Sequence, residues 1–93
     1  LTNGLPTTFD LAQNYPNPFN PQTTINYQLP KDVFVAIKIY DMLGREVAML
    51  VNQAQKAGYY SIVWNASQVS SGIYFYKITA GDFSSIKKMV VLK

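Results

Sequence analysis

Histidine and cysteine are both absent from this 93-residue chain. Without histidine the chain lacks the commonest general base and the commonest zinc ligand. Without cysteine it forms no disulfide, no thiolate metal site and no cysteine nucleophile. Charged residues are also scarce, at 14% of the chain against about 25% in typical globular domains. These shortages exclude much catalytic chemistry and leave packing as the main source of stability.

The formal net charge of +3 does not predict nucleic-acid binding. The basic residues are scattered, apart from Lys87-Lys88 and Lys93, whereas a nucleic-acid surface needs a clustered patch. No apolar run approaches the roughly 18 residues of a membrane span, and no signal peptide is visible. The chain starts at Leu1 rather than Met, so we expect one domain cut from a longer protein.

The acidic residues are better suited to turns than to catalysis. They are Asp10, Asp32, Asp41, Glu46 and Asp82. No two are placed as a carboxylate pair for glycoside hydrolysis, and the loop at 65–71 has no acid to bind Ca²⁺. Ser70 and Ser71 have no base to activate them. We therefore expect no catalytic residue and no cofactor or metal.

Prolines shape the N-terminal quarter. Residues 1–8 read as a linker, and Phe9 and Leu11 alternate as in a short edge strand. Pro16, Pro18 and Pro21 then exclude a helix.

Period-two alternation of apolar side chains predicts the later strands. They are expected at 23–29, 33–40, 46–51, 59–64, 73–80 and 83–92. Turn signals separate them, including Gly44 and the Gly81-Asp82 pair, which suits a two-residue hairpin.

Residues 41–57 are compatible with either a strand or a helix, because several of their apolar side chains also fit helical spacing. Gly44 would lie inside such a helix and valines recur, so a strand is favoured. In this strand we expect Val47, Met49 and Val51 to face one way.

About seven short strands without a helix predict an all-β fold, an immunoglobulin-like antiparallel β-sandwich. We expect Trp64 between the sheets. The strand order, and above all the placement of residues 45–52, is left open. Tyr59, Tyr74 and Tyr76, with Trp64, could instead stack on sugars in a carbohydrate-binding accessory module, but alternating tyrosines more often line a core and its rim.

The last seven residues, Lys-Lys-Met-Val-Val-Leu-Lys, are unusually apolar for a chain end. Lysine on an edge strand guards against aggregation. An apolar end is either tucked into the sheet or read by a partner, for example through strand addition.

Five segments together carry a family resemblance. They are Asn14 to Pro21, Thr23 to Ile25, Ile39 to Val47, Gly72 to Tyr76 and Lys87 to Lys93. In this order they resemble the C-terminal sorting domain (type A) of type IX secretion cargo, from about Phe9 to Lys93.

The resemblance implies an immunoglobulin-like domain, residues 9–93, attached through a linker, residues 1–8, to upstream cargo in the same chain. The outer-membrane secretion machinery would recognise it in the periplasm and move the cargo to the cell surface or the medium. A sortase-like peptidase would then cut at or before residues 1–8, and the cargo could be joined to an anionic lipopolysaccharide.

The resemblance also implies the recognition positions. They are Pro16, Asn17, Pro18, Gly72, Tyr74, Lys87, Lys88, Val90, Val91, Leu92 and Lys93.

The immunoglobulin-like domain of the flagellar hook-capping protein is similar in its Asn-Tyr-Pro-Asn-Pro block and its Leu-Gly-Arg-Glu-Val turn. There the tryptophan is typically followed by Asp-Gly, whereas here Trp64 is followed by Asn65-Ala66. This departure and the lysine-bearing last strand favour the sorting function over a structural or self-assembly module.

Overall fold

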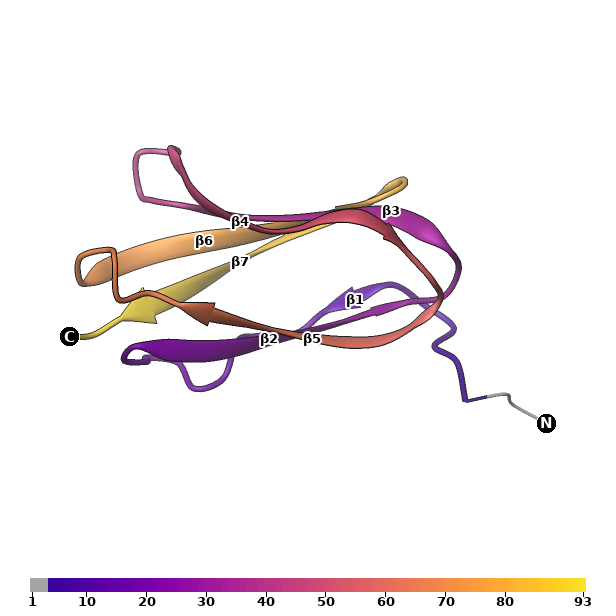
Figure 1. The fold of residues 1–93 in the computed structure, drawn as a ribbon, viewed down its shortest axis with the longest axis horizontal. Helices are drawn as coiled ribbons and strands as arrows, with labels where there is room; N and C mark the ends of the chain where they lie inside the picture. Colours follow the sequence, from indigo (N-terminus) through magenta and orange to yellow (C-terminus); the bar gives the residue numbers. More distant parts are fainter. Residues whose placement is uncertain (1–3) are drawn as a thin grey trace.

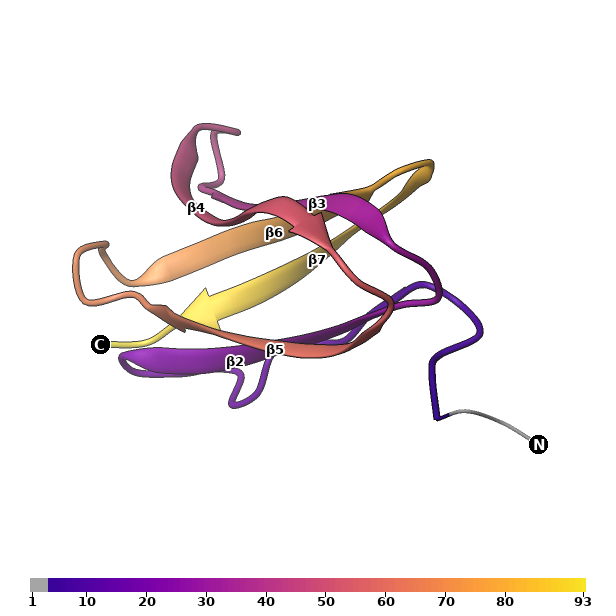
Figure 2. The same ribbon diagram turned by 45° about the vertical axis from the view of Figure 1, so that its right-hand side comes forward.

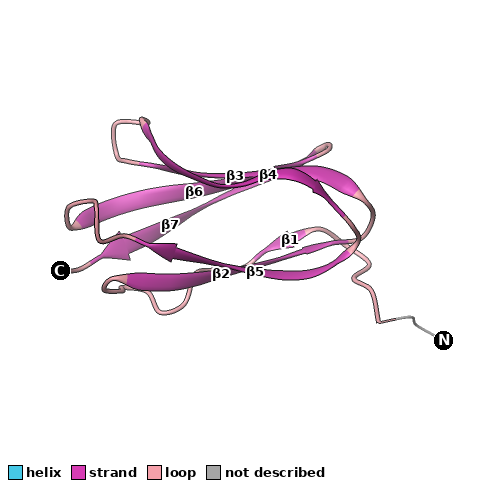
Figure 3. Cartoon of the chain, viewed as in Figure 1, coloured by secondary structure: helices cyan, strands magenta, loops and turns pink. Residues whose placement is uncertain are grey.

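The computed structural model describes residues 4–93, which form seven strands in two antiparallel sheets and no helix (Figures 1 and 3). The strands are β1 (Asp10–Leu11), β2 (Gln22–Leu29), β3 (Val33–Tyr40), β4 (Glu46–Gln55), β5 (Gly58–Asn65), β6 (Gly72–Ala80) and β7 (Phe83–Val91). One sheet has the order β1-β2-β5 and the other the order β4-β3-β6-β7. The predicted seven-strand sandwich is confirmed.

The core lies between the sheets and follows the predicted alternation. Ile25, Tyr27 and Leu29 of β2 are buried, and so are the odd-numbered residues from 35 to 39 of β3 and the even-numbered residues from 74 to 80 of β6. Trp64 is 6% exposed and lies between the sheets, as expected. Its ring meets Phe19 and Tyr74 edge to face, at centroid distances of 5.9 and 5.8 Å.

The strand β4 corrects one expectation and settles an open one. It pairs with β3, which places residues 45–52 in the four-stranded sheet. The pairing shifts register twice, and each β-bulge reverses the alternation of faces. Val47 and Met49 are therefore 37% and 50% exposed while Val51 is 8% exposed, so the expectation that these three share a face is wrong.

The two lateral sides of the sandwich differ. On one side β1 lies beside β7, and Phe9 stacks on Phe83 with ring centroids 5.1 Å apart. The proline-rich segment lies on this side and bridges both sheets, through Tyr15 to Thr24 and through Phe19 to Val91. The opposite side exposes β4 and β5, each paired on one edge only.

The two ends of the sandwich also differ. Residues 4–8 lie at one end and the C-terminus at the other (Figures 1 and 2). Residues 1–3 of the expected linker lie outside the described residues. Pro6 is buried, and the carbonyl of Thr8 accepts a hydrogen bond from the Gln28 side chain at 3.0 Å, so the second half of this segment contacts the domain.

The two hairpin glycines should differ in how much stability is lost when each is replaced by alanine. Gly44 and Gly81 both have a left-handed φ, +81° and +60°. A Cβ at Gly81 would lie 3.0 Å from Val33 Cγ2, whereas a Cβ at Gly44 meets nothing within 4 Å. Backbone strain of about 1–2 kcal/mol applies to both substitutions, so Gly81→Ala, with added crowding, should lower the unfolding free energy more than Gly44→Ala. Urea denaturation measures the difference, and equal losses would contradict the β6–β7 turn geometry.

Candidate recognition site

Residues 12–21, which we call the Asn-Pro segment, form the centre of the candidate site. The peptide bonds before Pro16, Pro18 and Pro21 are cis. Proline has no N–H to donate to a strand ladder, so side-chain hydrogen bonds supplement the backbone hydrogen bonds that Ala12, Tyr15 and Phe19 make. Asn14 and Thr23 provide several of these side-chain bonds and are only 2% and 1% exposed.

Asn14 joins the Asn-Pro segment to β2. Its Nδ2 donates to Thr23 Oγ1 at 2.9 Å and to the Pro16 carbonyl at 3.1 Å. The Thr23 hydroxyl donates to the same carbonyl at 2.8 Å, and Gln13 Nε2 donates to Asn14 Oδ1 at 2.7 Å. Among the described residues, no buried side-chain polar atom lacks a hydrogen-bond partner. The buried amide is therefore fully compensated.

Tyr76 joins the same segment to the four-stranded sheet. Its hydroxyl accepts a hydrogen bond from the Asn14 backbone N–H at 2.8 Å and donates one to the Ala12 carbonyl at 2.7 Å. The side chain is fully buried in β6. Burial raises the pKa of Tyr76 to about 12, while the hydrogen bond from Asn14 acts in the opposite direction.

The Asn-Pro segment also covers part of the outer edge of β7. The Phe19 N–H donates to the Val90 carbonyl at 3.1 Å, and the Leu92 N–H donates to the Phe19 carbonyl at 3.0 Å. Asn17 Oδ1 accepts from the Val90 N–H at 2.9 Å, and Gln13 Nε2 donates to the Lys88 carbonyl at 2.7 Å. The backbone edge of the last strand is thus already hydrogen-bonded to the Asn-Pro segment from Lys88 to Leu92. This is the edge at which strand addition by a partner was one expectation.

The Gly72-x-Tyr74 block meets the last strand from its other side. Gly72 pairs with Val91, and Tyr74 pairs with Met89. The Tyr74 hydroxyl donates to the Ser70 carbonyl at 2.7 Å. The next contacts come from Lys93, whose N–H donates to Ser71 Oγ at 2.9 Å and whose Nζ donates to the carbonyls of Ser67, at 3.0 Å, and of Val69.

The structure brings the predicted recognition residues other than Lys87 together at one end of the sandwich, whereas Lys87 lies at the middle of β7. It does not leave all of them accessible. Tyr74 and Val91 are core residues, 6% and 0% exposed. Gly72, Lys87 and Val90 are half-buried, and the exposed members are Pro16, Asn17, Pro18, Lys88, Leu92 and Lys93. Their role in recognition stays a prediction.

Lys87 has a structural explanation of its own. It lies on the core-facing side of β7, opposite the buried Tyr76. An inward-pointing charge on an edge strand discourages pairing with other chains.

Sequence reasoning missed the hydrogen-bond network of Asn14, Thr23 and Tyr76. One signal was available, because Thr23 has the same parity as the inward-facing Ile25 and Tyr27. A polar residue in an inward position needs a partner. Nothing in the sequence identified that partner as Asn14.

The aromatic side chains considered for sugar binding do not lie together on one surface. Tyr74, Tyr76 and Trp64 are buried, while Tyr59 is 65% exposed beside a shallow hollow of about 300 Å³, so the four rings form no common platform for a sugar. Asp41 and Asp32 act at turns: backbone N–H groups of Arg45 and Ala57 lower the pKa values of Asp41 and Asp32, respectively.

Within residues 4–93, no group of three or more His, Cys, Asp or Glu side chains is placed to hold a metal ion. No helix in this part of the chain is long and apolar enough to cross a membrane.

Residues 13–92 match the family described as the secretion system C-terminal sorting domain. The chain belongs to this family, the C-terminal sorting domains of type IX secretion. No curated protein matches the chain.

Family membership confirms the resemblance found in the sequence. The domain is a C-terminal sorting signal for type IX secretion, which implies export to the cell surface or secretion. Such a signal implies an upstream cargo in the same chain and a secretion machinery that acts on it. The family is in general non-catalytic.

The buried hydrogen bonds of Tyr76 should contribute measurably to stability. Tyr76→Phe leaves the Asn14 N–H and the Ala12 carbonyl without their partner and should cost about 1–3 kcal/mol of unfolding free energy. Tyr59→Phe removes a hydroxyl from a 65% exposed side chain and should stay within about 0.5 kcal/mol. Urea denaturation at pH 7 measures both. A Tyr76→Phe variant as stable as the Tyr59→Phe control would contradict the network.

The third prediction concerns alkaline pH. The folded pKa of Tyr76 is about 12, above the ordinary value of 10.0. Its contribution to stability is therefore complete below pH 10 and is lost as pH rises from 10 to 12, because the unfolded phenol ionises first. The stability difference between the parent and Tyr76→Phe should shrink across this window. A constant difference in urea titrations at pH 9, 10 and 11 would argue against a buried, neutral Tyr76.

Proposed function

We propose that the outer-membrane type IX machinery recognises this domain in the periplasm, as a folded unit, through one end of the sandwich. We call this region the composite end and define it as residues 13–19, 70–74 and 88–93. The cargo is then moved to the cell surface or the medium. A sortase-like peptidase cuts in the linker, at or before residues 1–8.

The observation that carries this proposal is the convergence of three separate sequence blocks. Asn17 and Phe19 bond to the last strand from one side, and Gly72 pairs with it from the other. The backbone edge between Lys88 and Leu92 is already bonded. Strand addition there would have to displace the Asn-Pro segment, so the machinery reads the side chains of the composite end.

The position of the composite end supports the same proposal. It lies at the end of the sandwich that carries the C-terminus, opposite residues 4–8 (Figures 1 and 2). A cargo domain preceding the linker would sit at the far end. Recognition and linker cleavage would then take place at opposite ends of the domain.

A self-assembly function has less support. Its best candidate surface is the free edge of β4, which is long and carries the exposed Val47 and Met49. The two register shifts in the β3–β4 pairing distort this edge, and bulged edges discourage strand pairing between chains.

Truncation gives the first test of sorting. The domain is fused behind a signal peptide and a reporter in a type IX-competent host, and deletion of residues 87–93 should leave the reporter in the periplasm. Cell fractionation measures the outcome. Equal export of the truncated fusion would refute recognition through the last strand.

A point substitution separates recognition from folding, because the deletion also removes the buried Met89 and Val91. Leu92→Asp changes a side chain that is 57% exposed, and Val63→Asp is a matched control on β5, 53% exposed. We expect surface reporter to fall at least tenfold for Leu92→Asp and to stay within twofold for Val63→Asp, with both variants folded by circular dichroism. Equal export of the two variants would contradict the proposal that the machinery recognises Leu92.

A further inference from the structure

Along its final residues, the last strand is accessible to a binding partner from one side only. Its inner side is core, because Met89 and Val91 are fully buried. Its edge is covered by the Asn-Pro segment. The side chains of Lys88 and Val90 lie on the outer face of the four-stranded sheet, and Leu92, just beyond β7, is 57% exposed. A partner that contacts these side chains therefore also meets this outer face.

Two cross-strand rows build the middle of that face. One row runs from Tyr40 through Phe75 to Lys88, and the other from Lys38 through Lys77 to Ile86. We call these six residues the basic outer face. Part of it borders an open, shallow hollow of about 330 Å³, lined by Tyr40, Met42, Phe75, Lys77, Ile86 and the hairpin residues Asp41 and Gly44.

The charges of this region do not balance. Glu46 pairs with Lys38 at 3.5 Å, and Asp41 pairs with Arg45 at 2.8 Å. Lys77 and Lys88 have no acidic partner within residues 4–93. The two acids nearest to the basic outer face are thus neutralised locally, and two ammonium groups are left beside apolar side chains.

One of these lysines also opposes another cation. Lys77 lies directly across from Lys38 on the neighbouring strand, and like charges in this position destabilise a sheet. A neutral or acidic residue at position 77 would relieve the repulsion.

We propose that the basic outer face docks an acidic protein surface, in which carboxylates flank an apolar or aromatic side chain. The apolar side chain enters the hollow beside Phe75 and Ile86, and the carboxylates bind Lys77 and Lys88 through charge-assisted hydrogen bonds. Opposite charge also accelerates the encounter of the two proteins. This inference rests on the proposed function, because it gives the chemistry of the partner that reads the composite end.

An anionic membrane is the less favoured partner. Electrostatic binding to lipid headgroups typically uses clusters of about 4–8 basic residues, whereas only Lys77 and Lys88 are unpaired on this face. The hollow beside them has room for a side chain, which suits a protein surface better than a layer of headgroups.

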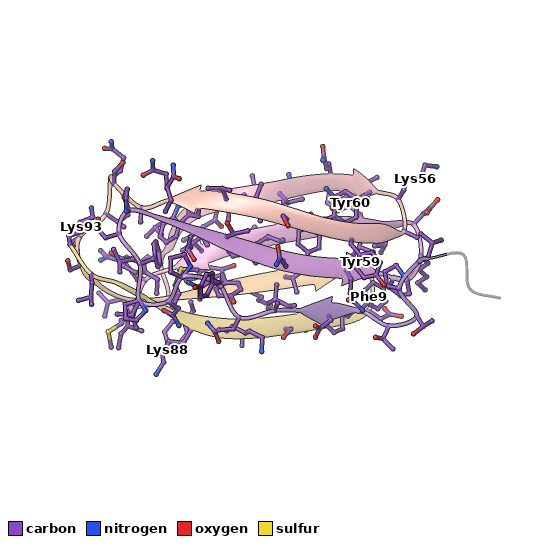
Figure 4. All side chains as sticks on the ribbon, turned by 90° about the horizontal axis from the view of Figure 1, so that it is seen from below. Phe9, Lys56, Tyr59, Tyr60, Lys88 and Lys93 are labelled. Atoms are coloured by element: carbon purple, nitrogen blue, oxygen red, sulfur yellow. The ribbon has the colours of Figure 1, made fainter. Side chains whose placement is uncertain are left out.

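Charge reversal tests the proposal in the same reporter fusion. The pair Lys77→Glu and Lys88→Glu should lower surface reporter at least tenfold, with accumulation in the periplasm. Lys77→Gln with Lys88→Gln should give a smaller loss, of about threefold, because it removes attraction without adding repulsion. The matched control is Lys31→Glu with Lys56→Glu, which makes the same charge change. Figure 4 shows Lys56 at the end of the sandwich opposite Lys88 and Lys93, and the control should export within twofold of the parent.

Folding is checked on each purified variant. Lys77→Glu places a carboxylate opposite Lys38, so its melting temperature should equal or exceed that of the parent. A well-folded variant that fails to export supports the docking surface. Full export of the charge-reversed pair would overturn it, even if Leu92→Asp still blocks export and the proposed function stands.

A second experiment measures sedimentation of the domain with vesicles of phosphatidylglycerol. The parent domain should sediment with them no more than the charge-reversed variant does. Sedimentation that is strong for the parent and lost on charge reversal would assign the face to a membrane and overturn the protein partner.

Discussion

Asn14, a buried residue, joins the Asn-Pro segment to both sheets of the domain. It bonds to Thr23 on β2 and to the Pro16 carbonyl, and its backbone N–H reaches Tyr76 on β6. A buried polar group left without a partner costs about 1–3 kcal/mol, so each of these bonds helps to hold the Asn-Pro segment in place. The docked segment then carries Asn17 and Phe19 to the last strand.

Two consequences follow for the rest of the sandwich. The docked segment places Phe19 against Trp64, which in turn packs on Tyr74. The polar network and the aromatic core therefore stabilise each other. The edge of β7 is also closed where an apolar strand would otherwise invite pairing with other chains. Because the composite end combines residues 13–19, 70–74 and 88–93, it exists only in the folded domain. A machinery that reads it selects folded cargo tails.

Much of the fold follows from elementary patterns in the sequence. Alternation gave the inward faces of β2, β3 and β6, and the position of Trp64, because one face of each strand must be buried. The same rule failed in β4, where two bulges expose Val47 and Met49. A bulge depends on the pairing partner, and alternation within one strand carries no information about that partner.

The candidate site was predictable only in part. The motif positions were read from the family resemblance, and the structure shows that Tyr74 and Val91 are core residues while Leu92 and Lys88 are exposed. The rows of the basic outer face depend on the register between β3, β6 and β7. Register is a long-range property, so the opposition of Lys38 and Lys77 was not visible in the sequence.

The most direct measurement of the central claim is amide hydrogen exchange by NMR at the closed edge. The N–H groups of Phe19, Val90 and Leu92 point into the contact between the Asn-Pro segment and β7. If this contact is a fixed part of the fold, these amides are protected to nearly the same degree as those of the central strand β3. Exchange as fast as that of exposed loop amides would show that the edge is open, and would contradict recognition of a closed composite end.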